Sequence, residues 1–211
     1  MTDIHAHVVP NVDDGSKSLE DSISLLKRAE KEGISRLVCT PHFRRGVYEA
    51  TRADIEQAFS TLVENNPTGV ELFLGREITI DKGVYKALKS GELSTMAGGK
   101  YVLCEYPYTK PFDVASSVYE LKIAGFKPII AHIERYEYLS VEDVAEIRSM
   151  EALIQVNASS FFASPLASFR RRAHKYLEKE FIDVISSDIH FTREYNMKKA
   201  YEAIKKRYGT E

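Results

Sequence analysis

The sequence predicts a single α/β domain over residues 1–211, folded as a small, distorted (β/α)7 TIM-like barrel. Short runs rich in β-branched residues alternate with segments of helical period along the whole chain, which is typical of parallel strands joined by right-handed crossovers. No glycine-rich dinucleotide motif follows the first run, so a barrel fits better than an open doubly wound sheet. The sequence also shows no internal repeat, low-complexity tract or linker that would divide it into two domains.

Seven apolar runs have the length and composition of buried parallel strands. At about 30 residues for each strand and its helix, seven such units account for the length of the chain, which favours a barrel. The predicted strands are 2–5, 35–40, 70–74, 100–105, 127–131, 152–156 and 182–186.

Apolar residues recur every three or four positions between these runs, which predicts helices with one face against the sheet. Ser18 followed by Asp21 resembles a helix start, and Gly33 and Gly125 end two helices just before the next strand. The apolar positions are Leu19, Ile23 and Leu26; Ile55, Phe59 and Leu62; Val84 and Leu88; Val114, Val118 and Leu121; Val144 and Ile147; Leu177; and Ala200 and Ile204.

The composition excludes several classes of protein. A formal net charge of −2 gives no basic footprint for nucleic acid, and we interpret the basic residues of 198–207 as a solvated helix face. The chain begins directly in an apolar strand without signal-peptide features and has no apolar stretch of membrane-spanning length, so we expect a cytoplasmic protein with no membrane insertion. Cys39 and Cys104 lie inside apolar runs and are expected to be reduced core thiols.

Pairs of metal-competent residues stand near both ends of the chain. His5 and His7 end the first predicted strand, and Asp188 and His190 follow the last one. On an extended strand, residues two positions apart point to the same face. Imidazoles and carboxylates without a nearby thiolate favour Mn²⁺, Fe²⁺ or Zn²⁺ of the catalytic kind over a structural zinc bound by cysteines.

Further metal-competent residues stand where the other predicted strands stop. In a barrel of this kind the C-terminal ends of the strands meet at one face, where active sites lie. Five of the six histidines occupy such positions, whereas His174 lies in a basic helical stretch and is expected at the surface. This joint placement predicts a metal cluster rather than separate core histidines. The additional candidates at strand ends are His42, Glu77, Glu105 and His132.

Six short motifs together resemble the polymerase-and-histidinol-phosphatase (PHP) superfamily. They are DIHAH at 3–7, DDG at 13–15, TPH at 40–42, GREI at 75–78, AHIER at 131–135 and SDIH at 187–190. The length, the DDG motif and the HIERY stretch are most similar to the bacterial metal-dependent protein tyrosine phosphatases of the CpsB/YwqE type, which are encoded with capsule and exopolysaccharide genes. The similarity covers essentially the whole chain and implies a PHP-type barrel.

The resemblance implies a site for up to three divalent ions, Mn²⁺ first, with Fe²⁺ or Zn²⁺ as alternatives. Glu77 would bridge two of these ions. Four carboxylates against three divalent ions leave a positive field that suits a phosphate dianion. The implied ligand sets are His5, His7, Glu77 and Asp188 for one ion, Glu77, Glu105 and His132 for a second, and Asp14, His42 and His190 for a third.

The resemblance also implies a protein tyrosine phosphatase that acts on the phosphotyrosine tail of a bacterial tyrosine autokinase controlling capsule or exopolysaccharide synthesis. We expect direct in-line hydrolysis by water that the ions activate, without a covalent phosphoenzyme. Arg135 follows His132 by three residues and is the candidate catalytic residue, because its planar guanidinium can hold two phosphate oxygens. Another PHP phosphoesterase activity, on histidinol phosphate or a nucleotide, stays open. The complete ligand set argues against a non-catalytic module with the same fold.

A rival phosphatase chemistry has a formal signature in the chain. Cys39 and Arg45 match the CX5R pattern of cysteine-dependent tyrosine phosphatases. That chemistry needs a phosphate cradle of free backbone N–H groups, which Pro41 interrupts, so we interpret Cys39 as a core residue. Arg44 and Arg45 are weaker candidates than Arg135 for contacting phosphate. The loop tyrosines that could pack against a substrate ring, with no role assigned, are Tyr48, Tyr106, Tyr108, Tyr136 and Tyr138.

Overall fold

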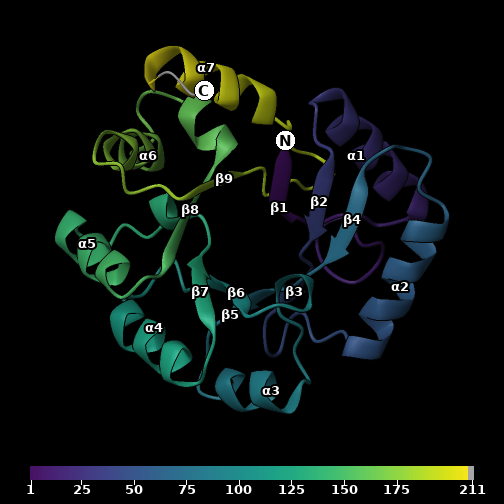
Figure 1. The fold of residues 1–211 in the computed structure, drawn as a ribbon, viewed down its shortest axis with the longest axis horizontal. Helices are drawn as coiled ribbons and strands as arrows, with labels where there is room; N and C mark the ends of the chain where they lie inside the picture. The colour runs from purple at the N-terminus through teal and green to yellow at the C-terminus, as the bar shows by residue number, and fades with distance from the viewer. Residues whose placement is uncertain (209–211) are drawn as a thin grey trace.

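The computed structural model describes residues 1–208 and shows parallel strands curled around an axis with helices on the outside (Figure 1). The predicted alternation of strands and helices in one α/β domain is confirmed. The strands are β1 Thr2–Ala6, β2 Arg36–Cys39, β3 His42–Phe43, β4 Glu71–Leu74, β5 Glu77–Thr79, β6 Tyr101–Glu105, β7 Lys127–Ile130, β8 Leu153–Asn157 and β9 Val184–Ser186. The α-helices are α1 Leu19–Lys31, α2 Arg52–Glu64, α3 Val84–Ser90, α4 Val114–Ile123, α5 Val141–Ser149, α6 Ser168–Glu178 and α7 Met197–Tyr208, and the 3₁₀ helices are η1 Met96–Gly98, η2 Ile133–Arg135 and η3 Ala158–Phe162.

Residues 1–208 contain nine strands, not the seven that the sequence predicts, because two short strands, β3 and β5, follow β2 and β4 beyond the ends of the predicted runs 35–40 and 70–74. β2 is separated from β3 by Pro41, which has no N–H to donate to a ladder. β4 is separated from β5 at Gly75, where an added Cβ would lie only 2.8 Å from Met96 Sδ, so glycine lets η1 approach the chain. The strands therefore form two parallel sheets, in the orders β1-β2-β4 and β3-β5-β6-β7-β8-β9.

The segment after β9 lies beside β1 and joins the two sheets at that point. His7 N–H donates to the carbonyl oxygen of Ile189 at 3.0 Å, and Asp188 N–H donates to the carbonyl oxygen of His5 at 2.9 Å. Ala6 forms an isolated parallel bridge with Ile189. These contacts bring the metal-competent residues of the two ends of the chain next to one another.

The core has an inner and an outer part, because successive side chains of a strand point to opposite faces. Val38, Leu103 and Ile129 belong to a small cluster that the curled sheet encloses, together with Met96 from η1. Their strand neighbours, such as Leu37, pack in larger clusters with the surrounding helices. This inner cluster is apolar, and the polar residues at the C-terminal ends of the strands are not part of it.

The predicted helix boundaries are confirmed where specific residues encode them. Ser18 Oγ accepts a hydrogen bond from Asp21 N–H at 3.1 Å, which caps α1. Gly33 follows α1 with a φ of +82° and Gly125 follows α4 with a φ of +92°, left-handed conformations that glycine adopts without strain.

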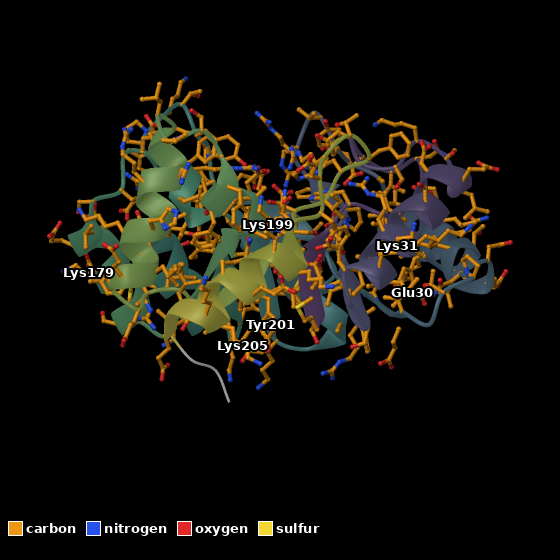
Figure 2. All side chains as sticks on the ribbon, turned by 90° about the horizontal axis from the view of Figure 1, so that it is seen from above. Glu30, Lys31, Lys179, Lys199, Tyr201 and Lys205 are labelled. Carbon is orange, nitrogen blue, oxygen red and sulfur yellow. The ribbon has the colours of Figure 1, made fainter. Side chains whose placement is uncertain are left out.

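The basic residues of α7 and the two cysteines lie where the sequence predicts them. Lys199 and Lys205 of α7 lie exposed on the outside of the molecule (Figure 2). Cys39 and Cys104 are both free and buried, as predicted. His174 on α6 is half-buried and not fully at the surface as predicted, because its ring packs against that of Phe161, with centroids 5.5 Å apart; it belongs to none of the clusters of potential ligands.

Across residues 1–208, none of the helices has the length and apolar character needed to span a membrane.

Candidate metal centre and active site

The predicted metal ligands lie together at the C-terminal ends of the strands, around a cavity of about 180 Å³. Two of the nine, His5 and His7, are fully buried and contact Glu77. The other seven line the cavity itself: Asp14, His42, Glu77, Glu105, His132, Asp188 and His190.

Glu77 lies at the centre of this group. Its Oε2 is 3.1 Å from His5 Nε2 and 3.2 Å from His7 Nε2. The same oxygen is 3.0 Å from His42 Nδ1, and Oε1 is 2.7 Å from His132 Nε2. Burial alone would raise the pKa of this carboxyl, but the surrounding imidazoles hold the pKa of Glu77 well below its usual range. An anionic carboxylate with two oxygens aimed at different histidines suits a bridge between ions.

In His5 and His7, an oxygen atom of another side chain fixes the Nδ1 atom of the ring. His5 Nδ1 lies 3.2 Å from Gln155 Oε1, and His7 Nδ1 lies 2.7 Å from Asp13 Oδ2. Because both oxygens accept hydrogen bonds, each Nδ1 carries a proton and Nε2 is the atom available to bind a metal ion. The two Nε2 atoms are 3.2 Å apart. Burial lowers the pKa of His7, but Asp13 outweighs it and raises that pKa well above its ordinary value.

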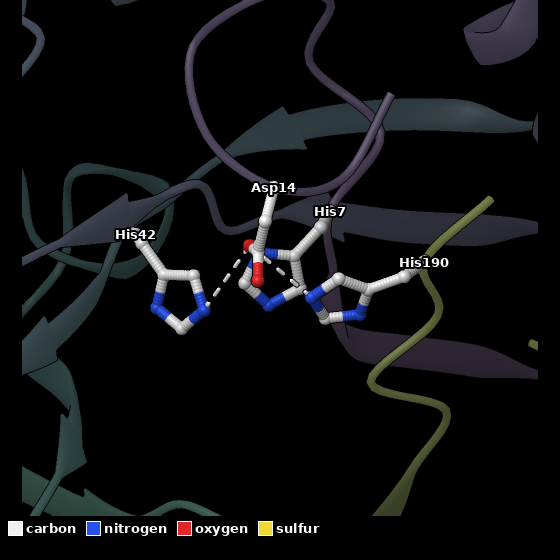
Figure 3. Close-up of side chains that lie close together, drawn as sticks. All are labelled: His7, Asp14, His42 and His190. Atoms are coloured by element: carbon white, nitrogen blue, oxygen red, sulfur yellow. Dashed lines mark ion pairs between the residues drawn. The ribbon is translucent and has the colours of Figure 1, made fainter. Parts of the chain in front are cut away.

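Asp14 joins two further histidines (Figure 3). Its Oδ1 lies 3.5 Å from His42 Nε2 and 3.4 Å from His190 Nε2. The centroid of the His7 ring lies 4.4 Å from that of the His42 ring and 4.2 Å from that of the His190 ring. The close contact with His190 and the charge of His42 keep the pKa of Asp14 well below its ordinary value.

Three buried atoms of the cluster face other candidate ligands without making a well-formed hydrogen bond to any described residue: His42 Nδ1, Glu77 Oε2 and His190 Nε2. Buried ligand atoms that face one another in this way are rare and suit an ion bound between them. The potential ligand atoms form groups that lie within 4.8 Å of one another, close to the separation of two atoms that each bind one metal ion at about 2.0–2.3 Å. The groups are His7, Asp14, His42 and His190; His5, His7 and Glu77; and His42, Glu77 and Glu105.

Glu105 can complete a metal site with either of two histidines. Thr79 Oγ1 and Tyr108 Oη each donate to its carboxylate at 2.6 Å, which holds the side chain at the end of β6. His42 Nδ1 lies 3.9 Å from Glu105 Oε2, and His132 Nε2 lies 4.0 Å from Oε1. The family resemblance implies His132 alone, so His42 is an added candidate.

Asp188 connects the cluster to two arginines. Its Oδ1 lies 3.6 Å from His5 Nε2, on the metal-competent side. Its Oδ2 accepts from Arg135 Nη2 at 3.0 Å, Arg193 Nη1 at 2.8 Å and Asn157 Nδ2 at 2.8 Å. Burial alone would raise the pKa of Asp188, but His5 and the neighbouring cations hold it well below its usual range. Both arginines line the cavity beside the carboxylate.

Two candidate ligands have a left-handed backbone. The φ angle is +34° at His132 and +50° at Asp188, a conformation that costs a non-glycine residue about 1–3 kcal/mol. His132 N–H donates to Gln155 Oε1 at 2.8 Å, and Asp188 N–H donates to the carbonyl oxygen of His5 at 2.9 Å. These hydrogen bonds hold both ligands in a strained geometry, which is a common property of functional sites.

Sequence reasoning missed Arg193, which lines the cavity. It follows His190 by three residues, as Arg135 follows His132, so the same spacing argument could have found it. It also left unassigned the residues that hydrogen-bond to the candidate ligands: Asp13, Thr79, Gln155 and Asn157.

The structure distinguishes the weaker candidates for phosphate contact, Arg44 and Arg45, and places the cysteine of the CX5R pattern. Arg44 lines the cavity. Arg45 instead pairs with Asp81 at 2.9 Å. Cys39 is fully buried in the outer core, and burial raises the pKa of its thiol, so it lacks the reactive thiolate of the CX5R enzymes.

One family model and its named members match this chain over nearly its whole length. The family model for capsular polysaccharide synthesis, CpsB/CapC, matches residues 1–211. The tyrosine-protein phosphatase CpsB of Streptococcus pneumoniae is 31% identical over 222 residues, which cover 99% of this chain and 91% of that protein. The tyrosine-protein phosphatase YwqE of Bacillus subtilis (strain 168) is 29% identical, with coverage of 100% and 86%.

Solved structures agree with this result. A structure from the pair YwqE of Bacillus subtilis and CpsB of Streptococcus pneumoniae, described as unique metal-dependent tyrosine phosphatases, has a TM-score of 0.89 and 27% identity, covering 100% of this chain and 89% of that one. The lactonase Lmo2620 of Listeria monocytogenes, with a TM-score of 0.58 and 11% identity over 98% of this chain and 84% of its own, shares the fold alone. The predicted resemblance to the CpsB/YwqE type is confirmed, and the chain belongs to the capsular polysaccharide synthesis family CpsB/CapC.

Proposed function

We propose that this protein is a metal-dependent protein tyrosine phosphatase. The observation that carries the proposal is the convergence of seven of the nine candidate metal ligands and three arginines on one cavity, with buried ligand atoms that make no well-formed hydrogen bond among the described residues. The relatives named as tyrosine-protein phosphatases, and the metal-dependent solved structure, support the same activity.

The metal would be Mn²⁺ in up to three positions, with Fe²⁺ or Zn²⁺ as alternatives. Imidazole and carboxylate donors without a thiolate fit these ions. The predicted ligands are His5, His7, Asp14, His42, Glu77, Glu105, His132, Asp188 and His190. Such ions, when bound, lower the pKa of water and neutralise the charge of a phosphate ester.

The arginines of this site would bind and orient the phosphate. Arg135 and Arg193 are held by the Oδ2 atom of Asp188, so their guanidinium groups stay beside the ligand cluster. A guanidinium can hold two phosphate oxygens and stabilise the charge that spreads over them during in-line attack. We assign Arg135 as the catalytic arginine, and the buried position of Cys39 supports hydrolysis without a cysteinyl-phosphate intermediate.

The partner that we propose is the phosphorylated, tyrosine-containing tail of a bacterial tyrosine autokinase that governs capsule or exopolysaccharide synthesis. The description of the family and the names of its phosphatase members support this substrate class. A cytoplasmic location is part of the same proposal.

Steady-state kinetics with Mn²⁺ test the proposal. The substrates are a phosphotyrosine peptide, histidinol phosphate and a nucleoside monophosphate, each measured with and without excess chelator. We expect the peptide to have the highest kcat/KM and chelation to abolish turnover. A clear preference for either small metabolite would replace the tyrosine-phosphatase assignment with another phosphoesterase activity, and full activity in excess chelator would refute a metal-dependent site.

A further inference from the structure

Five loop tyrosines have no role in the chemistry proposed above, and the structure separates them. Tyr106 and Tyr136 are fully buried in the core. Tyr138 packs against Tyr136, with 5.9 Å between the ring centroids, and does not line the cavity. Tyr48 and Tyr108 line the cavity that holds the candidate ligands. These two rings are therefore next to any substrate bound there.

A short hairpin holds Tyr48 in place. Arg44 N–H donates to the carbonyl oxygen of Tyr48 at 3.0 Å, and Tyr48 N–H donates to that of Arg44 at 2.8 Å. Gly46 at the turn has a φ of +75°, which glycine adopts without strain. The Tyr48 ring stacks on the ring of His42, with centroids 5.3 Å apart and an angle of 12° between the planes. One face of the ring is thus covered by a candidate metal ligand.

The chain after this hairpin is anchored from the core. Arg76 is almost fully buried, and its Nη2 donates to the carbonyl oxygen of Ala50 at 2.7 Å. Its guanidinium lies 5.0 Å from the centroid of the Phe43 ring. These contacts fix both ends of the segment that carries Tyr48, so its ring can act as a preorganised surface.

Tyr108 contributes a second ring from the loop after β6. Its hydroxyl donates to Glu105 at 2.6 Å, and its ring stacks on Tyr136, with centroids 5.6 Å apart and a plane angle of 16°. The residue is 40% exposed. Like Tyr48, it has one face covered by the protein and lines the same cavity.

We propose that Tyr48, together with Tyr108, forms an aromatic wall that packs against the aryl ring of the phosphate ester and gives the site its preference for aryl over alkyl phosphates. This inference rests on the proposed phosphatase function. An aryl ester carries its ring on the oxygen bonded to phosphorus, within reach of tyrosines that line the same cavity, whereas an alkyl ester of the same charge offers no π surface to them. Tyr48 is the better residue to test, because Tyr108 donates a 2.6 Å hydrogen bond to the candidate ligand Glu105, whereas Tyr48 contacts the candidate ligand His42 through the face of its ring. The Tyr48 hydroxyl also interacts with Asp14, so the metal content of each variant is measured beside its affinities.

Isothermal titration calorimetry with phenylphosphonate and methylphosphonate measures this preference without turnover. We expect the Mn²⁺-loaded protein to bind phenylphosphonate more tightly, and Tyr48→Ala to weaken that binding roughly three- to ten-fold, as expected for one aromatic pair. The affinity for methylphosphonate should stay unchanged. Tyr48→Phe keeps the ring and should restore the preference. Tyr119→Ala is the matched control, because Tyr119 lies on α4 with 60% exposure and does not line the cavity.

Kinetics give a second readout. With a phosphotyrosine peptide, Tyr48→Ala should raise KM and leave kcat nearly unchanged, since the ring does not touch the phosphorus. Equal weakening of both phosphonates by Tyr48→Ala, or no effect on either, would overturn the inference. Absence of peptide hydrolysis by the wild-type protein would instead overturn the proposed function, and the two phosphonate affinities would still decide the role of the ring.

Discussion

The carboxylate of Asp3 accepts a hydrogen bond from the backbone N–H of Ser187 at 3.1 Å, across 184 positions of the chain. The same side chain accepts from Tyr195 Oη at 2.8 Å and is fully buried. Asp3 therefore connects β1 to the segment after β9 and to the chain that leads into α7. This contact fixes the two ligand-bearing motifs relative to one another.

Replacement of Asp3 by alanine should destabilise the protein by about 1–3 kcal/mol for each buried donor that it leaves unpaired. Urea unfolding of the metal-free protein measures the change. Glu202→Ala on the exposed surface of α7 is the control and should stay within about 0.5 kcal/mol of the wild type. Equal stability of the two variants would show that the Asp3 contacts do not hold the motifs together.

Replacement of Arg135 by alanine should raise the activation barrier by about 2–4 kcal/mol, comparable to the loss of one donor to a developing oxyanion. Metal content should stay intact, because Arg193 and Asn157 still donate to Asp188. Steady-state kinetics and elemental analysis of the same preparation give both quantities. Arg36→Ala removes an exposed guanidinium at the start of β2, at the opposite end of the strands, and should have no effect. A loss of activity that follows a loss of metal would contradict a phosphate-binding role.

The stability of the metal-free protein should pass through a maximum with pH. The pKa values of Glu77 and Asp188 are lowered in the fold, so their contribution is present above about pH 4 and is lost as the pH falls. The pKa values of His5 and His7 are raised, so their contribution is present below about pH 6.5 and is lost as the pH rises through the raised values. We therefore expect the highest Tm between these two limits.

Addition of Mn²⁺ should remove the loss of stability on the alkaline side, because the ion takes the place of the proton on Nε2 and binds only the folded state. Thermal melts between pH 5 and 9 at about one-unit steps, with Mn²⁺ and with chelator, measure the difference. Curves that run parallel with and without Mn²⁺ would contradict metal binding at these histidines.

Replacement of Cys39 by serine should leave kcat/KM nearly unchanged in the folded, metal-loaded protein, because the thiol is buried and its pKa is raised. Iodoacetamide should likewise fail to inhibit the wild type. Cys104→Ser is the matched control, since Cys104 is also buried with a raised thiol pKa and lies outside the CX5R pattern. Loss of all activity in Cys39→Ser with metal retained would instead support cysteine chemistry.

Local sequence patterns predict the seven main strands and the helices, but not the two additional strands β3 and β5. The periodicity of the chain predicts parallel strands and outer helices, and each predicted strand coincides with part of the observed sheet. The strand count of seven is wrong because β3 and β5 pair in a different sheet from β2 and β4, on the far side of Pro41 and Gly75. At Gly75 the interruption also depends on the close packing of η1 against the chain. A proline or a glycine alone does not specify these long-range partners.

The sequence likewise predicts one part of the candidate site and not the other. Strand-end positions predict the side chains that gather around Glu77, because all parallel strands present their C-terminal ends to one face. The outer partners Asp13 and Gln155, and the role of Arg193, are not evident from strand ends. Their function depends on which ring nitrogen or carboxylate oxygen each one meets.

The sequence by itself determined the residue types, their two-residue spacing and their place at the ends of strands, since these depend on local periodicity and side-chain chemistry. The tertiary structure decided that His5 and Asp188 lie side by side, and that Tyr48 and Tyr108 border the same cavity. The physical reason is that such proximity depends on contacts between segments far apart in the chain, such as that of Asp3 with Ser187 for the two motifs and that of Arg76 with Ala50 for the segment that carries Tyr48.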